Sequence, residues 1–164
     1  MTQEPTIIII TDANIIINLF RIGQLSLFGS LPPYRFHVPS DLVVEILDSA
    51  QQKALRNCIE AGQLEEIAVD MPAALPLFAE LRGTMSRGEA AYLALAATGG
   101  FYIASDEKKQ FRRKATQLIG EARILGTEFL LLEAIRRDQM TIRDADQFKD
   151  ILAANKRATV QLIR

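Results

Sequence analysis

The chain has 164 residues, of which 49% are hydrophobic and 24% are charged, as expected for one compact domain with a sizeable apolar core. Its single cysteine and single histidine exclude an internal disulfide and a zinc site built on Cys and His ligands. The formal net charge of −1 provides no overall basic field for binding nucleic acid. A metal ion would therefore be held mainly by oxygen atoms.

The apolar segments are too short to span a membrane. The run Ile7–Ile10 is followed by polar residues, whereas a membrane helix needs about 20 apolar residues. The start Met1–Pro5 lacks the basic and apolar regions of a secretory signal. We therefore expect a cytoplasmic protein without a membrane contact.

The first half of the chain alternates strand and helix patterns. Apolar β-branched runs predict the strands and helical periodicity predicts the helices. The expected strands cover Ile7–Ile10, Arg35–Val38 and Glu66–Val69. The expected helices cover 13–20, 50–61 and 72–81, with one more that begins at 39–41 and runs through Leu47.

The same alternation continues in the second half. Ser86 and Glu89 match a capping box before an alanine-rich helix at 90–98, which Gly99 and Gly100 end. Strands are expected at 101–105 and 123–125, helices at 106–116, 128–137 and 141–155, and a short strand-like end at Thr159–Ile163.

Alternating strands and helices predict right-handed crossovers and a mainly parallel sheet with helices on both faces. No linker or repeat interrupts the pattern, so residues 1–164 are expected to form a single domain. Its core would cover about 6–140 and a C-terminal helical extension about 141–164. In such sheets the functional crevice lies beyond the carboxyl ends of the strands.

Four acidic residues are expected near that edge. Asp12 and Asp106 directly follow predicted strands, and Glu45 and Glu89 lie in the first turns of predicted helices. Carboxylates brought close together raise each other's pKa unless a cation neutralises them, and oxygen ligands suit Mg²⁺ or Mn²⁺. The four acids therefore predict a divalent-cation site.

Each acid also has a purely structural interpretation. Asp12 and Asp106 stand at N-cap positions, Glu89 completes the capping box, and Glu45 aligns with other acids on a polar helical face. Only their joint placement favours a site. Three small polar residues at the same edge would support the carboxylates: Asn14, Ser105 and Thr127.

A basic run follows Asp106. Positive residues at this position can bind a phosphate backbone, although such a run can also be a solvated helix face. The candidate nucleic-acid-binding residues are Lys108, Lys109, Arg112 and Arg113.

These motifs, in this order, resemble the PIN-domain nucleases over about residues 6–140. The resemblance rests on five segments, and the stretch Asn18–Leu27 further resembles the prokaryotic branch of VapC-type toxins. The five segments are Thr11–Asn14, Val38–Ser40 with Glu45, Ser86–Ala90, Ile103–Asp106 and Leu125–Thr127.

The resemblance implies a three-layer α/β/α fold and metal-dependent hydrolysis of RNA, with an antitoxin partner and a homodimer as is usual in the family. Asp12 and Asp106 would bind the metal, Glu89 would complete its shell, and Glu45 would orient water or a second ion. Asn14 and Thr127 would be supporting groups.

Two positions depart from the family pattern. Phe129 lies in a segment where relatives commonly have a small residue, so the substrate groove is expected to be narrower. Glu107 follows Asp106 where relatives often carry a second Asp, so the metal geometry is expected to shift slightly.

Two other functions fit parts of the sequence. A haloacid dehalogenase-type phosphatase also places an Asp after its first strand, but Asn14 stands where its second Asp is expected and no Lys precedes Asp106. A catalytically silent, PIN-like or response-regulator-like module would use the acids only as helix caps and bind protein or RNA. The metal-dependent ribonuclease accounts for all four acids.

Overall fold

A five-stranded parallel sheet forms the centre of the molecule. The structure is a computed structural model that describes residues 5–163, with side chains described as far as residue 155. The strand order is β3-β2-β1-β4-β5, and every neighbouring pair is parallel. The strands are β1 (Ile7–Thr11), β2 (Tyr34–Pro39), β3 (Glu65–Ile67), β4 (Tyr102–Ala104) and β5 (Ile124–Leu125).

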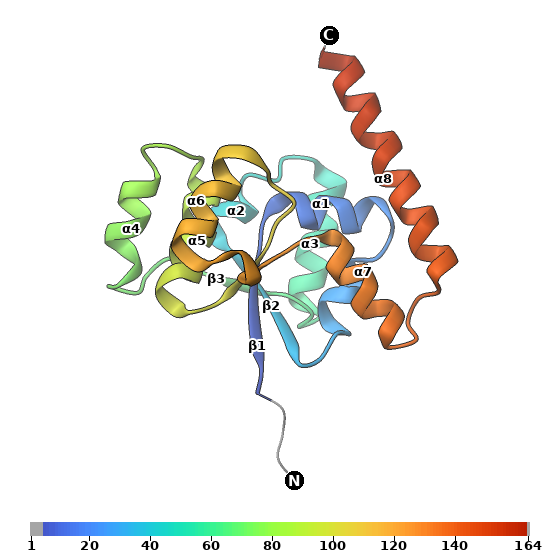
Figure 1. Cartoon of the computed structure of the whole chain (residues 1–164), viewed down its shortest axis with the longest axis horizontal. Helices are drawn as coiled ribbons and strands as arrows, with labels where there is room; N and C mark the ends of the chain where they lie inside the picture. Colours follow the sequence, from blue (N-terminus) through green and yellow to red (C-terminus); the bar gives the residue numbers. More distant parts are fainter. Residues whose placement is uncertain (1–4, 164) are drawn as a thin grey trace.

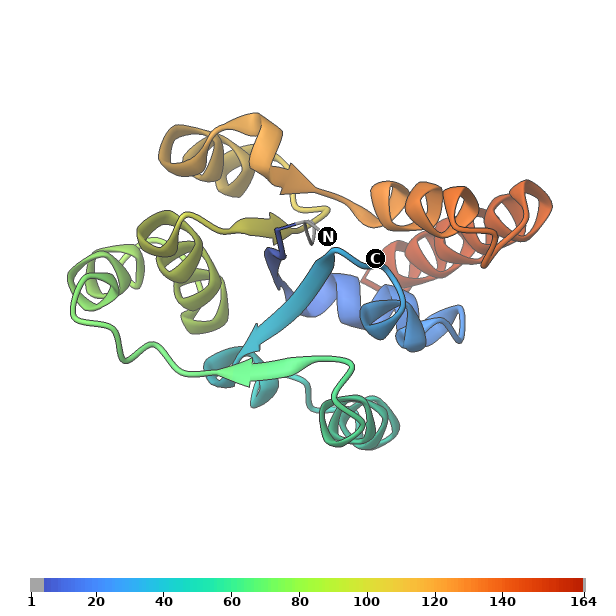
Figure 2. The same cartoon turned by 90° about the horizontal axis from the view of Figure 1, so that it is seen from below.

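Helices cover both faces of this sheet. Helices α4, α5 and α6 lie on one side, and α1, α3, α7 and α8 lie on the other (Figures 1 and 2). The predicted three-layer α/β/α architecture is therefore confirmed. The helices are α1 (Ala13–Arg21), η1 (Leu25–Gly29), α2 (Ser40–Val43), α3 (Ser49–Glu60), α4 (Ala74–Leu81), α5 (Arg87–Gly99), α6 (Lys109–Ile119), η2 (Glu121–Arg123), α7 (Thr127–Arg136) and α8 (Ile142–Ile163).

Strand β1 and helix α5 form the core that positions the site. Ile9 and Ile10 of β1 are fully buried between β2 and β4. Helix α5 is buried along the stretch 90–96, where four of the seven residues are alanine. Small side chains let a helix pack closely on its neighbours, so α5 is apolar on all sides and directs its N-terminus to the carboxyl edge of the sheet.

Three predicted elements differ from the structure. Helix α2 ends at Val43, so Glu45 lies in the following turn and not in a helix. Helix α6 begins at Lys109 with Lys108 as its N-cap, so Asp106 belongs to a loop. The strand-like end at Thr159–Ile163 is wrong because α8 continues through Ile163. In the first two cases tertiary contacts of the loops decide the boundary.

Within residues 5–163, none of the helices combines the length and apolar character that crossing a membrane requires.

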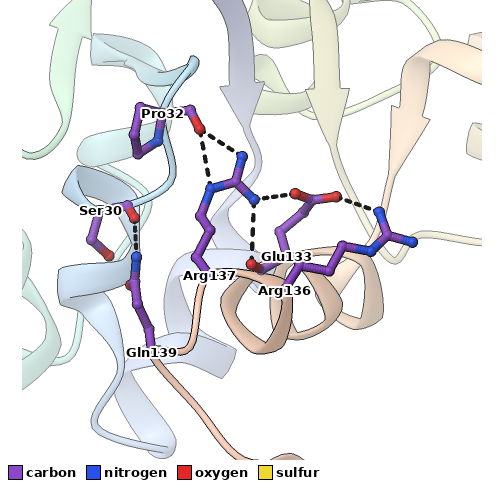
Figure 3. A network of polar contacts seen from close by, with 6 residues as sticks. All are labelled: Ser30, Pro32, Glu133, Arg136, Arg137 and Gln139. Atoms are coloured by element: carbon purple, nitrogen blue, oxygen red, sulfur yellow. Dashed lines mark hydrogen bonds and ion pairs between the residues drawn. The ribbon is translucent and has the colours of Figure 1, made fainter.

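A polar network attaches α7 to the segment before β2 (Figure 3). Glu133 is 6% exposed and pairs with Arg136 and Arg137. Arg137 also donates to the Pro32 carbonyl at 2.6 and 3.1 Å, and Gln139 donates to the Ser30 carbonyl. Arg137 thus both neutralises a buried carboxylate and satisfies a loop carbonyl.

Arg137→Ala is expected to lower the free energy of unfolding by about 2 kcal/mol or more, because it leaves Glu133 poorly neutralised and a carbonyl without a donor. Arg136→Ala is the matched control, since the Arg136 side chain is 71% exposed against 25% for Arg137. Its expected cost is below about 1 kcal/mol. Urea unfolding measures both, and equal losses would contradict this assignment.

Candidate metal centre

Asp12 is the most deeply buried acid at the carboxyl edge of the sheet. It is 3% exposed and directly follows β1. Its Oδ1 accepts the Ile15 backbone N–H at 2.9 Å, which makes Asp12 the N-cap of α1. Its Oδ2 is buried and has no hydrogen-bond partner among the described residues. Helix capping therefore accounts for only one of the two carboxylate oxygens.

Glu45 and Glu89 both lie at the N-terminus of α5. The Ser86 hydroxyl accepts the Glu89 backbone N–H at 3.1 Å, as the capping box predicts. Glu45 Oε1 accepts the Gly88 backbone N–H at 2.8 Å. A Cβ at position 88 would lie 2.5 Å from Glu45 Oε2, so only glycine allows this approach. The contact brings Glu45 to α5 although its own helix has ended.

Asp106 is bound to the N-terminus of α7. Its Oδ1 accepts the Thr127 backbone N–H at 2.9 Å, and its Oδ2 accepts the Thr127 hydroxyl at 2.5 Å and the Asn18 amide at 3.2 Å. The N-cap of α7 is Gly126, where an added Cβ would lie 2.6 Å from Asp106 Oδ1. These contacts join the loop after β4 to both α7 and α1.

Glu107, the next residue of the same loop, has different partners. Its Oε1 accepts the Asn14 amide at 2.6 Å, and its backbone N–H donates to the Ser105 hydroxyl at 3.1 Å. Ser105 is itself buried, 1% exposed. The supporting residues Asn14 and Ser105 therefore hold Glu107, while Thr127 holds Asp106.

Burial and mutual repulsion raise the pKa of two of these acids. Burial is the largest cause for Asp12 and raises its pKa from 3.8 to about 7. The Ile15 backbone N–H and the nearby Ser105 hydroxyl oppose this rise, and the negative charges of Glu107 and Asp106 add to it. Burial also raises the pKa of Glu89, with further increases from Glu107 and Glu45. Glu107 thus acts on both Asp12 and Glu89.

The acids influence one another electrostatically but do not form a closed cluster. Over the described part of the chain, no three acidic, histidine or cysteine side chains converge enough to enclose an ion. The donor chemistry nevertheless fits a divalent cation, because Asp12 offers a buried free oxygen and the negative charges of Glu107 and Asp106 act on it. Glu107 also has several rotatable bonds, so its oxygens can move toward an ion.

The predicted basic residues lie beside this edge, at the start of α6. Lys108, Lys109 and Arg113 are exposed, whereas Arg112 is half-buried and pairs with Glu121 at 3.7 Å. Lys109 has a φ of 58°, a left-handed conformation that is strained for a residue other than glycine. The exposed members of this run lie on a solvated surface shortly after Asp106 in the chain.

Sequence reasoning missed three residues of this arrangement. Glu107 was treated only as a departure from the family, and Asn18 and Gly88 were assigned no role in the site. The segment that contains Gly88 and Glu89 was recognisable, but the approach of Glu45 to Gly88 joins residues 43 positions apart. Only Glu107 had a local signal, since it adjoins Asp106 at the end of a strand.

Residues 8–162 match the family model described as DUF3368, a PIN domain. No curated protein and no solved structure matches the chain. The parallel sheet and its helical layers define a three-layer α/β/α domain. The chain belongs to the PIN-domain family, as the sequence motifs predicted, while the VapC-type branch stays a prediction.

The raised pKa of Asp12 predicts how stability depends on pH in metal-free protein. Between the ordinary value of 3.8 and about 7, the folded state binds more protons than the unfolded chain, so stability falls as the pH rises through this range. The slope is at most about 1.4 kcal/mol per pH unit. Asp12→Asn should remove most of this slope and be more stable than wild type near about pH 7.5.

Urea unfolding in EDTA at a series of pH values measures the slope. Glu80→Gln, which removes an exposed carboxylate on α4, serves as the control and should retain the wild-type slope. Parallel pH profiles for wild type and Asp12→Asn would contradict the assignment.

Proposed function

We propose that the chain is a metal-dependent endoribonuclease that hydrolyses RNA phosphodiester bonds. The observation that carries the proposal is the buried Asp12 carboxylate, which has one free oxygen at the carboxyl edge of the sheet and is acted on by the negative charges of Glu107 and Asp106. Membership of the PIN-domain family, a nuclease-type fold, supports it. A module that used its acids only as helix caps would not explain that free oxygen.

Asp12 and Glu89 would hold the divalent ion, Mg²⁺ or Mn²⁺, together with a carboxylate of the loop that contains Asp106 and Glu107. When bound, such an ion stabilises negative charge on a phosphate and makes water a better nucleophile. Glu45, fixed by the Gly88 backbone N–H, would orient the attacking water or a second ion. Asn14, Ser105 and Thr127 keep the carboxylates in position through the hydrogen bonds described above.

The exposed cations at the start of α6 would bind the RNA backbone. Lys108, Lys109 and Arg113 offer charge to phosphates without reading bases, and Arg112 contributes less because of its ion pair with Glu121. Phosphates held there would lie beside the loop that carries Asp106. Binding by these residues therefore places a phosphodiester near the acids.

We further propose that the protein acts as the toxin of a toxin–antitoxin pair, as a homodimer in the cytoplasm. The resemblance of Asn18–Leu27 to VapC-type toxins supports this role. Helix α8, which extends past the rest of the molecule (Figure 1), offers surface for either partner. Co-purification with the product of a neighbouring reading frame tests the pair.

End-labelled RNA incubated with purified protein in Mg²⁺, Mn²⁺ or EDTA tests the activity. Wild type is expected to cleave with either metal and not in EDTA, and Asp12→Asn and Glu89→Gln should each reduce the rate by about 100-fold or more. Glu80→Gln controls for the loss of a remote carboxylate. Absence of cleavage by folded wild type in both metals would favour the silent binding module.

The paired substitution Lys109→Ala/Arg113→Ala is expected to weaken RNA binding and to reduce its salt dependence. For single-stranded RNA the slope of log affinity against log salt should decrease by about 0.7 for each lost phosphate contact. Lys53→Ala/Arg56→Ala on α3 removes the same charge from the opposite face of the sheet. Fluorescence anisotropy in EDTA measures the RNA affinity of both double variants at several salt concentrations. Identical slopes for the two would show that these residues of α6 do not contact the RNA.

A further inference from the structure

The hydrogen bonds of Asp106 fasten the loop after β4 to the neighbouring helices α7 and α1. Both of its oxygens accept hydrogen bonds, three in all, from Thr127 and Asn18. The donors come from α7 and α1 and include a backbone N–H, which cannot turn away as a side chain can. To bind an ion strongly, Asp106 would have to share oxygens that these donors already use.

Glu107 has the opposite environment. It accepts one hydrogen bond, from Asn14 to Oε1, and among the described residues no hydrogen bond reaches its Oε2. The Ser105 hydroxyl fixes its backbone N–H and so sets the direction of the chain at this residue. Its charge acts on both Asp12 and Glu89, whereas that of Asp106 is felt at Asp12 alone of these two.

Asp12 provides an independent observation at the same place. The Oδ2 of Asp12 is buried and accepts no hydrogen bond from the described residues. Asp12 also lies two positions before Asn14, whose amide donates to Glu107. The free oxygen of Asp12 and the free oxygen of Glu107 thus belong to neighbouring side chains whose charges repel each other. A divalent cation is the ligand that neutralises two such carboxylates.

We propose that Glu107, and not Asp106, supplies the carboxylate of this loop that binds the divalent ion with Asp12 and Glu89, while Asp106 is a positioning residue that fastens the loop to Thr127. This inference rests on the proposed function and gives Glu107 the metal-binding role that the family resemblance implied for Asp106. The longer side chain at position 107 is then the ligand itself, with the Asn14 amide bound to its other oxygen.

Titration with Mn²⁺ by isothermal calorimetry, with metal-free melting temperatures alongside, tests the assignment without any activity assay. Glu107→Gln should weaken Mn²⁺ binding by about tenfold or more and leave the metal-free melting temperature unchanged or higher. Asp106→Asn should weaken Mn²⁺ binding less than Glu107→Gln does and lower the metal-free melting temperature. Thr127→Val, which keeps every carboxylate, should lower the melting temperature in the same way.

Glu80→Gln is the control for the loss of one negative charge and should bind Mn²⁺ as wild type does. Two results would overturn this inference but not the proposed function. In the first, Glu107→Gln binds Mn²⁺ as tightly as wild type does. In the second, Asp106→Asn weakens Mn²⁺ binding more than Glu107→Gln does. Absence of Mn²⁺ binding by folded wild type would overturn the inference together with the proposed metal-dependent activity.

Discussion

The structure depends on a carboxylate held at the end of its central strand with only one oxygen satisfied. Asp12 begins α1 through its Oδ1, and the backbone N–H of the same residue donates to the Ala104 carbonyl of β4 at 3.0 Å. Burying a carboxylate is costly unless it is paired or neutralised. The raised pKa of Asp12 expresses that cost, and a divalent cation would offset it.

Three of the acidic side chains at this edge of the sheet are held by the N-termini of helices. Glu45 accepts a backbone N–H at the start of α5, as Asp106 does at the start of α7 and Asp12 at the start of α1. Free backbone N–H groups and the helix dipole favour negative charge at such positions. For Asp12 and Glu45, capping and function therefore do not exclude each other, because one carboxylate oxygen can accept a helix N–H while the other faces a ligand.

Glu107 differs from these three because its partner is the Asn14 side chain and not a helix backbone. A carboxylate held by one flexible amide can change rotamer at lower cost than one held by backbone donors. The loop after β4 therefore combines a fixed acid and a movable acid in consecutive positions. Under the proposal above, Asp106 positions the loop and Glu107 binds the ion, so the two adjacent acids have different roles.

The sequence by itself determined the alternation of strands and helices and the parallel three-layer fold, because both follow from local periodicity. It also determined the PIN-domain family and the presence of acids at the strand ends, because these follow from the positions of residues such as Asp12 and Asp106 in the chain. Tertiary structure decided where α2 and α6 begin or end and which carboxylates are already occupied. Those outcomes depend on Gly88 meeting Glu45 and on Thr127 meeting Asp106, 43 and 21 positions apart in the chain. Such contacts form only when the helices pack, so no local pattern contains them.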